Sequence, residues 1–304
     1  MLDVRNAARF LRLCQVNTGE IAGTECPWEL NAGMEAREDY HDTLEALYVW
    51  SLPENIKDNA EFISNALRYL RYRFNAFKES REPAKSYDAA YIVFSLGEYR
   101  KNSHDSSVND MIQYAEKYLE NYFIGTPDRN LRDYSNPYWK AGLYGRYLIT
   151  SGKPINFLRK WVEEELDLIS PLEEINNEGP GYMFHHDFIS MYGAKLYAIG
   201  TLKANFDFDG FASTIPSGFT KRKFDEVAFN SIVMAGLVSI LPQISGNVRE
   251  NTMKAIKNIE NEIDSMVEGG GLRRGGNYFH LRESWPTFFY TYASHLLAAH
   301  NSLQ

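Results

Sequence analysis

Acidic and imidazole side chains stand at the starts of several apolar segments, where they could exchange protons with a ligand. These segments open with His41 and Asp42, Asp88, Trp139, the run His185, His186 and Asp187, Asp225, and the run Glu283, Ser284 and Trp285. A carboxylate beside an imidazole can act as an acid or a base near neutral pH. Asp and Ser before a helix also cap its free N–H groups. For Asp42, Asp187, Asp225 and Ser284 the sequence leaves both interpretations open.

His185, His186 and Asp187 form the most polar of these starts. Capping and packing explain them, and so does acid/base chemistry or contact with a ligand. Metal binding is disfavoured, because two histidines that share a metal on one helix face are normally one turn apart. We therefore predict no metal. The predicted catalytic residues are Asp42, Asp88, His186 and Asp187, and the predicted substrate contacts at these starts are His41, Trp139, His185 and Trp285.

The glycine-rich segment 268–285 leads to the last apolar segment and carries Arg273 and Arg274. Glycines allow backbone to approach a ligand closely, and arginines bind carboxylate or phosphate, so we predict that these two arginines hold an anionic head group. A solvated loop explains the segment equally well. No phosphate-binding loop or dinucleotide fingerprint is present, and we expect no cofactor. Asp207 and Asp209 lack the closing Glu of a calcium loop, so their role stays open.

Two kinds of helical pattern alternate along the chain. Segments that are apolar nearly all round begin near residues 43, 87, 138, 187, 225 and 284, and such helices must be surrounded by protein. Amphipathic segments lie between them at 5–16, 59–77, 108–123, 155–169 and 247–267, whereas 203–224 reads as a loop. No run alternates as a strand would. We predict an all-α fold, an α/α toroid of about six helical hairpins that forms one domain over 1–304. An open solenoid is the alternative.

Composition narrows the possible partners. Forty acidic and thirty-two basic residues give a net charge of −8, which argues against nucleic-acid binding. No segment is long and apolar enough to span a membrane, and the first residues do not form a signal peptide, so we expect a cytoplasmic protein. Two cysteines cannot build a disulfide framework. Twenty Tyr and eighteen Phe could line a cavity for an apolar ligand or fill a core.

Three stretches resemble the α/α toroid superfamily of terpenoid cyclases, protein prenyltransferase β subunits and complement-type thioester domains. They are FLRLCQVNTGEI at 10–21, HDTLEALYVW at 41–50, and EGGGLRRGG with the following ESWPTFFYTYASHLL. The likeness covers nearly the whole chain and implies the toroid architecture. The catalytic motifs of the family are missing. No Asp-x-Cys zinc motif is present, FDFDG at 206–210 lacks the last Asp of a cyclase Asp-x-Asp-Asp motif, and neither cysteine lies in a thioester motif.

Three functions remain open at this stage. The first is an enzyme of the terpenoid-cyclase or prenyltransferase type, with an apolar, isoprenoid-like substrate in an aromatic-lined central cavity. The second is a carbohydrate-active hydrolase or lyase with paired carboxylates and stacking aromatics. The third is a non-catalytic module that binds a protein partner through an apolar patch. The resemblance favours the first, and the lining of the ring's centre separates the three.

Overall fold

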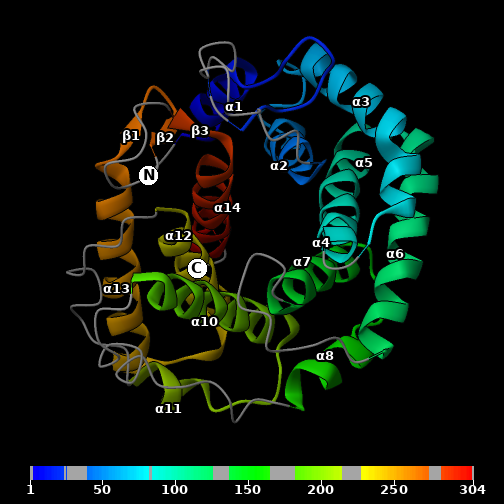
Figure 1. Cartoon of the computed structure of the whole chain (residues 1–304). Coiled ribbons are helices and arrows are strands. Elements are labelled where there is room, and N and C mark those ends of the chain that lie inside the picture. The colour runs from blue at the N-terminus through cyan, green and yellow to red at the C-terminus, as the bar shows by residue number, and fades with distance from the viewer. Residues whose placement is uncertain are drawn as a thin grey trace.

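The computed structural model describes residues 3–23, 25, 40–81, 84–125, 137–164, 182–213, 227–273 and 282–302. For 182–191, 227–229 and 273 it describes only the backbone. The described helices form a closed ring with an inner and an outer layer (Figure 1). This confirms the predicted all-α toroid.

The inner layer consists of helices that are buried over most of their length. They are α2 (Tyr40–Ser51), the continuous run of α4 (Ala84–Tyr91), the π-helix η2 (Ile92–Leu96) and α5 (Gly97–Ser103), α7 (Pro137–Thr150), α10 (Tyr182–Leu202), α12 (Val227–Ile240) and α14 (Ser284–Asn301). Each packs against the next, and α14 packs against α2, which closes the ring. Apolar side chains all round these helices are therefore covered by neighbours on every side.

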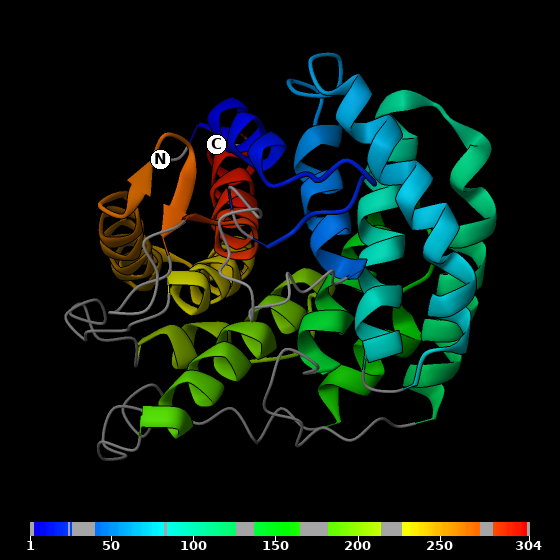
Figure 2. The same cartoon turned by 45° about the horizontal axis from the view of Figure 1, so that its top comes forward.

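The outer layer consists of amphipathic helices that bury one face. They are α1 (Val4–Leu13), α3 (Ala60–Glu79), α6 (Asn109–Ile124), α8 (Asn156–Glu163), α11 (Phe208–Ser213) and α13 (Gly246–Asp264). In α3, for example, Ile63, Leu67 and Leu70 are buried and Arg68 is exposed. Figure 2 shows the outer helices flanking the inner ones around the ring. Two short 3-10 helices, η3 (Ser106–Val108) and η6 (Leu241–Gln243), stand before α6 and after α12.

Two sequence expectations about the elements are wrong. The segment 203–224, expected as a loop, contains the outer helix α11, which fills the sixth outer position. Asp207 explains its start, because Oδ1 accepts the backbone N–H of Gly210 at 2.9 Å and so caps the helix. Asp209 accepts the backbone N–H of Ser245 at 3.0 Å, next to the start of α13. These two aspartates therefore hold α11 in place.

A small antiparallel sheet, also not expected, joins α13 to α14. Its strands are β1 (Val267–Glu268), β2 (Gly271–Arg273) and β3 (Arg282–Glu283), in the order β1-β2-β3. The strands are too short for a periodic pattern to reveal them. Leu272 in β2 is buried, and its N–H donates to Thr287 Oγ1 of α14 at 3.0 Å. The sheet thus fixes the position at which α14 begins.

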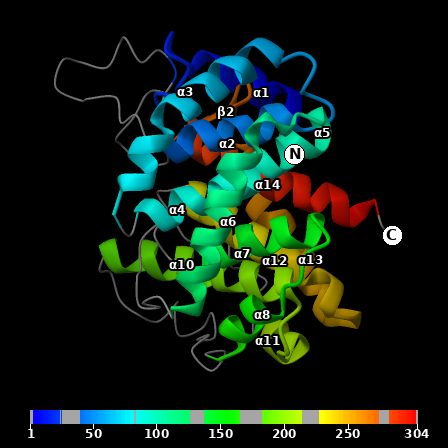
Figure 3. The ribbon, with the colours of Figure 1, turned by 90° about the vertical axis from the view of Figure 1, so that its right-hand side faces the viewer.

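The inner helices run in the same direction along the ring axis. Early residues of α2 contact early residues of α4, as His41 meets Asp88, and later residues meet later ones, as Tyr48 stacks on Phe94. In the side view the last turns of α14 project at one side of the ring (Figure 3). The ring therefore has two different ends: the amino-terminal mouth, where the inner helices begin, and the carboxyl-terminal mouth, where they end.

Candidate functional site

His41 lies at the amino-terminal mouth between two carboxylates. It is the one residue of α2 that is not buried. Its Nδ1 lies 3.3 Å from Asp88 Oδ1, and its Nε2 lies 3.6 Å from Asp42 Oδ1. The ring meets Tyr87 edge to face at 4.8 Å between ring centroids. One imidazole therefore joins an acid from α2 to an acid from α4.

The imidazole of His41 is protonated at neutral pH. Burial lowers its pKa, but the hydrogen bond to Asp88 and the negative charges of Asp42, Glu45 and Asp88 together raise that pKa to about 10. Asp42 lies in the first turn of α2, where the positive end of the helix dipole favours a carboxylate. The mouth thus contains a charged imidazole, His41, with the carboxylates of Asp42 and Asp88 beside it.

Residues 21–23, which precede α2 in the sequence, connect two inner helices at this mouth. Gly23 has φ of +74°, a conformation that favours glycine, and its Cα faces the carboxylate of Asp42 closely enough that an added Cβ would stand 3.9 Å from Oδ2. The carbonyl of Gly23 accepts the N–H of Ser284 at 2.8 Å and its hydroxyl at 3.1 Å. Nearby, Thr43 Oγ1 accepts the N–H of Ile21 at 3.1 Å. Residues 21–23 therefore tie the first turn of α2 to the start of α14.

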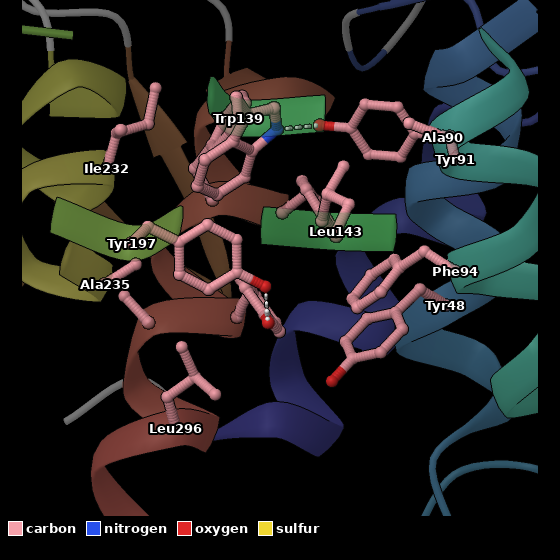
Figure 4. Packing of buried hydrophobic residues seen from close by; sticks show 14 of the residues in the cluster. Tyr48, Ala90, Tyr91, Phe94, Trp139, Leu143, Tyr197, Ile232, Ala235 and Leu296 are labelled. Atoms are coloured by element: carbon pink, nitrogen blue, oxygen red, sulfur yellow. Dashed lines mark hydrogen bonds between the residues drawn. The ribbon is translucent and has the colours of Figure 1, made fainter. Parts of the chain in front are cut away.

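A chain of hydroxyl groups lies beneath His41. Trp139 Nε1 of α7 donates to the hydroxyl of Tyr91 at 3.1 Å (Figure 4). The Tyr91 hydroxyl lies 3.3 Å from the hydroxyl of Tyr87. Burial and the charge of Glu45 raise the pKa of Tyr87 and of Tyr91 well above the ordinary value. These phenols stay neutral, so among the described residues they add no charge to that of the imidazolium and the carboxylates.

The centre of the ring below this chain is filled by aromatic side chains, which we call the aromatic plug. Tyr48 stacks on Phe94 at 4.5 Å and meets Tyr292 edge to face at 5.5 Å. The hydroxyl of Tyr197 is hydrogen-bonded to that of Tyr292. The plug comprises Tyr48, Phe94, Trp139, Tyr197, Phe288, Phe289 and Tyr292, all of them buried. Figure 4 shows several of them converging from different helices. The Tyr197 ring packs directly against Gly142, where any larger side chain would clash with it.

Among the described residues of this mouth, Trp285 is an aromatic side chain that reaches solvent. It is half-buried at the second position of α14, and its Nε1 donates to Glu283 Oε2 at 2.7 Å. Its ring stands edge-on to Phe289 at 6.3 Å, and Phe289 packs on Trp139 at 5.2 Å. The indole is therefore held from two sides and offers a preorganised surface beside the acids.

The structure brings some of the predicted site residues together. His41, Asp42 and Asp88 form one cluster, and Trp285 lies at the same mouth. Trp139, expected to face a ligand, is buried in the plug with its N–H already bonded to Tyr91. Burial in the plug removes the large apolar area of the indole from water, which stabilises the core.

Asp42, Ser284 and Asp187 do not stand just before their helices, the position that capping would require. Asp42 was expected just before a helix, but α2 already begins at Tyr40. Ser284 is the first residue of α14, and its hydroxyl donates to Gly23 rather than accepting an N–H of its own helix. Asp187 stands inside α10, which begins at Tyr182, instead of preceding it.

The other predicted residues lie beyond what the structure describes in full. The backbone of His185, His186 and Asp187 belongs to the first turns of α10, which is an inner helix, and their side chains lie outside the described residues. Arg273 is the last residue of β2, and its side chain lies outside the described residues. Arg274 and Asp225 lie outside them entirely. Their predicted roles stay predictions.

Sequence reasoning missed Glu45 and the tyrosine pair Tyr87 and Tyr91. Glu45 is buried one turn after Asp42, and its charge acts on His41 and on both tyrosines. The signal was present: an acid in the middle of an otherwise apolar inner helix is costly unless it has partners. Among the described residues no group of three or more His, Cys, Asp and Glu side chains could hold a metal ion.

Comparison with known proteins places the fold. No protein-family model matches the sequence, and no curated protein matches it significantly. The GH76A alpha-1,6-mannanase from Salegentibacter sp. HEL1_6 has a similar structure, with a TM-score of 0.59, 10% identity, and coverage of 98% of this chain and 100% of that chain. Two inactive variants of that enzyme, solved with alpha-1,6-mannotriose and alpha-1,6-mannotetrose, each give a TM-score of 0.57, at 10% and 8% identity, and each cover 98% of this chain. This similarity shows an α/α toroid.

These neighbours contradict the prediction of a terpenoid-cyclase or prenyltransferase type of enzyme. They are mannanases, two of them solved with oligosaccharides, and they favour the carbohydrate-active alternative. The aromatic residues that suggested an isoprenoid cavity pack against one another in the plug. Both inactive variants replace two consecutive aspartates, whereas this sequence contains no two consecutive aspartates. No helix in the described part of the chain is long and apolar enough to cross a bilayer.

Proposed function

We propose that this protein is a carbohydrate-active enzyme that hydrolyses glycosidic bonds of a glycan bound across the amino-terminal mouth. The observation that carries the proposal is the cluster of His41, Asp42 and Asp88, two carboxylates from neighbouring inner helices with a protonated imidazole between them. Glycoside hydrolysis most often uses a pair of acidic residues that flank the scissile bond. The mannanase neighbours support a glycan as the ligand.

The cluster contains the groups that this chemistry needs. One group must give a proton to the leaving oxygen, and one carboxylate must attack the sugar or activate water. His41 holds the proton, because its pKa of about 10 keeps it charged at neutral pH. Asp88 accepts the hydrogen bond from Nδ1 and fixes the ring, while Asp42 lies next to Nε2. In this assignment His41 is the proton donor, Asp42 the reacting carboxylate and Asp88 the positioning residue.

Trp285 supports a sugar ring in the same proposal. An indole held in one orientation by Glu283 and Phe289 provides a flat apolar face at little entropic cost. The carboxylates beside it accept hydrogen bonds from sugar hydroxyls. The plug forms the floor, so the glycan lies across the mouth and does not thread the ring.

The test is to incubate the purified protein with alpha-1,6-linked mannan oligosaccharides and with other linear glycans, and to separate the products by chromatography. We expect shortened products from at least one glycan, and their loss in Asp42→Asn. Retained binding in Asp42→Asn, measured by calorimetry, would separate chemistry from binding. Binding without cleavage by the native protein would overturn the hydrolase assignment, and neither binding nor cleavage of any glycan would overturn the carbohydrate assignment altogether.

A further inference from the structure

The carboxyl-terminal mouth of the ring carries its own set of partly exposed polar residues. In α7 every residue from Pro137 to Leu148 is buried except Arg146, and in α14 His295 is a half-buried position between buried neighbours. In α5, Glu98 is half-buried. On α7 and α14 these residues interrupt runs of buried residues, and α5 buries only Tyr99, so solvent reaches this end of the ring at these side chains.

The three residues lie one turn beyond the aromatic plug. Arg146 follows Gly142 by four residues, and the Tyr197 ring packs on Gly142. Glu98 follows the plug residue Phe94 by four residues. His295 follows Tyr292 by three, and its ring stands 6.5 Å from that of Tyr48, edge to face. Residues three or four apart share a helix face, so these polar groups form a layer directly beneath the plug.

Tyrosine hydroxyls face the same layer. In Figure 4 the hydroxyls of Tyr48 and Tyr197 both lie on the side of the plug away from the Trp139 indole N–H. Burial raises the pKa of Tyr197 well above its ordinary value, and the positive charge of Arg146 partly offsets that rise. The mouth is therefore lined by a cation, an imidazole and phenol hydroxyls.

Within the described part of the chain, several hydrogen-bond donors at this mouth have no protein acceptor. There the guanidinium of Arg146, the imidazole of His295 and the hydroxyl of Tyr48 make no hydrogen bond or ion pair with protein. Glu98 is engaged elsewhere, accepting from Asn102 Nδ2 at 2.9 Å and from Lys101 at 3.3 Å. A half-buried guanidinium offers five N–H donors in a fixed fork that fits a carboxylate.

We propose that the carboxyl-terminal mouth is a second ligand site, which binds a small hydroxylated monocarboxylate through Arg146, with Tyr48 and His295 contacting its hydroxyl groups. A single negative charge fits better than two, because Glu98 and the carbonyl ends of the inner helices already make the surroundings negative. This site lies across the plug from His41 and does not depend on the proposed hydrolysis.

The experiment uses the full chain and three probes of similar size: D-gluconate as monocarboxylate, D-glucitol as its neutral counterpart, and D-glucose 6-phosphate as dianion. Binding is followed by calorimetry and by NMR titration of the His295 imidazole. We expect gluconate to bind more tightly than either other probe and to raise the pKa of His295, which burial lowers in the free protein. Arg146→Gln should weaken gluconate binding about tenfold or more.

Three controls decide between outcomes. Arg73→Gln removes an exposed arginine of α3 and should leave gluconate binding unchanged. Arg146→Lys keeps the charge without the fork and should bind with intermediate affinity. Asp42→Asn should not affect gluconate binding, which separates this site from the amino-terminal mouth. Three results would overturn the proposal: equal binding of gluconate and glucitol, equal gluconate binding by Arg146→Gln and the native protein, or no gluconate binding by the native protein. Each would mean that Arg146 is a solvated cation and not part of a ligand site.

Discussion

The two mouths of the ring are built by the same inner helices and differ in the charge they carry. The amino-terminal mouth gathers carboxylates around one imidazolium, with Asp42 and Asp88 beside His41. The carboxyl-terminal mouth carries a half-buried guanidinium, Arg146, one turn beyond the plug. Helix dipoles favour acids at helix starts and cations at helix ends, and both mouths follow that preference.

The difference shows how parallel inner helices can give one ring two chemically distinct surfaces. The aromatic plug separates the two surfaces, since Tyr197 and Tyr292 close the space between them. Side chains at one mouth are therefore separated from those at the other by packed aromatic rings. The following predictions test the amino-terminal mouth and the plug that separates it from the other mouth.

The largest effect is expected from the carboxylate that holds His41. Asp88→Asn removes the charged hydrogen bond to Nδ1, so the imidazole loses its orientation and much of its positive charge. Glycan hydrolysis should fall by about 100-fold or more, the range of general acid–base catalysis. Asp110→Asn, an exposed carboxylate at the start of α6, is the matched control and should leave the rate unchanged. An unaltered rate in Asp88→Asn would remove the amino-terminal mouth from the mechanism.

A pH dependence of stability should follow from His41. Its pKa is about 10 in the folded protein and about 6.5 when unfolded, so its contribution to stability is full below pH 6.5 and declines as the pH rises toward 10. We expect native stability to drop by on the order of 1–3 kcal/mol over this window, allowing for partial exposure of the ring. His41→Gln should flatten the curve measured by urea unfolding, and a curve of unchanged slope would contradict the charged imidazole.

The single and double removal of the buried hydroxyl pair of the plug should change stability in a non-additive way. Tyr197→Phe leaves the Tyr292 hydroxyl without its partner and should cost about 1–2 kcal/mol of unfolding free energy. The double variant that also carries Tyr292→Phe should cost less than the sum, because no hydroxyl is then left unsatisfied. Chemical denaturation measures all three variants. Additive losses would mean that the two hydroxyls do not depend on each other.

The smallest effect is expected at Trp285. Trp285→Ala should weaken glycan binding about tenfold, the scale of one aromatic contact, and leave the rate at saturating glycan nearly unchanged. Trp285→Phe should recover most of the loss because it keeps an aromatic face. Steady-state kinetics separates KM from kcat here, and a loss confined to kcat would place the indole in the chemical step.

Sequence reasoning predicted the architecture because hydrophobic patterning is a local property. Apolar stretches such as 227–241 cannot face water on any side, and amphipathic stretches such as 59–77 must cover them. The short helix α11 and the strands β1 to β3 escaped prediction since elements of a few residues leave too little pattern. For the site, the sequence indicated His41, Asp42 and Asp88 individually, from their polar types at apolar segments.

The sequence by itself determined two classes of helix, their alternation, and the polar residues at the helix starts. Only the tertiary structure decided that Asp88 meets His41, 47 residues away, and that the aromatic residues fill the ring instead of lining a cavity. It also decided that Arg146 and His295 share the opposite mouth. The reason is physical: pattern along a chain reports which face of a helix is buried, whereas the partner on that face depends on how distant helices pack.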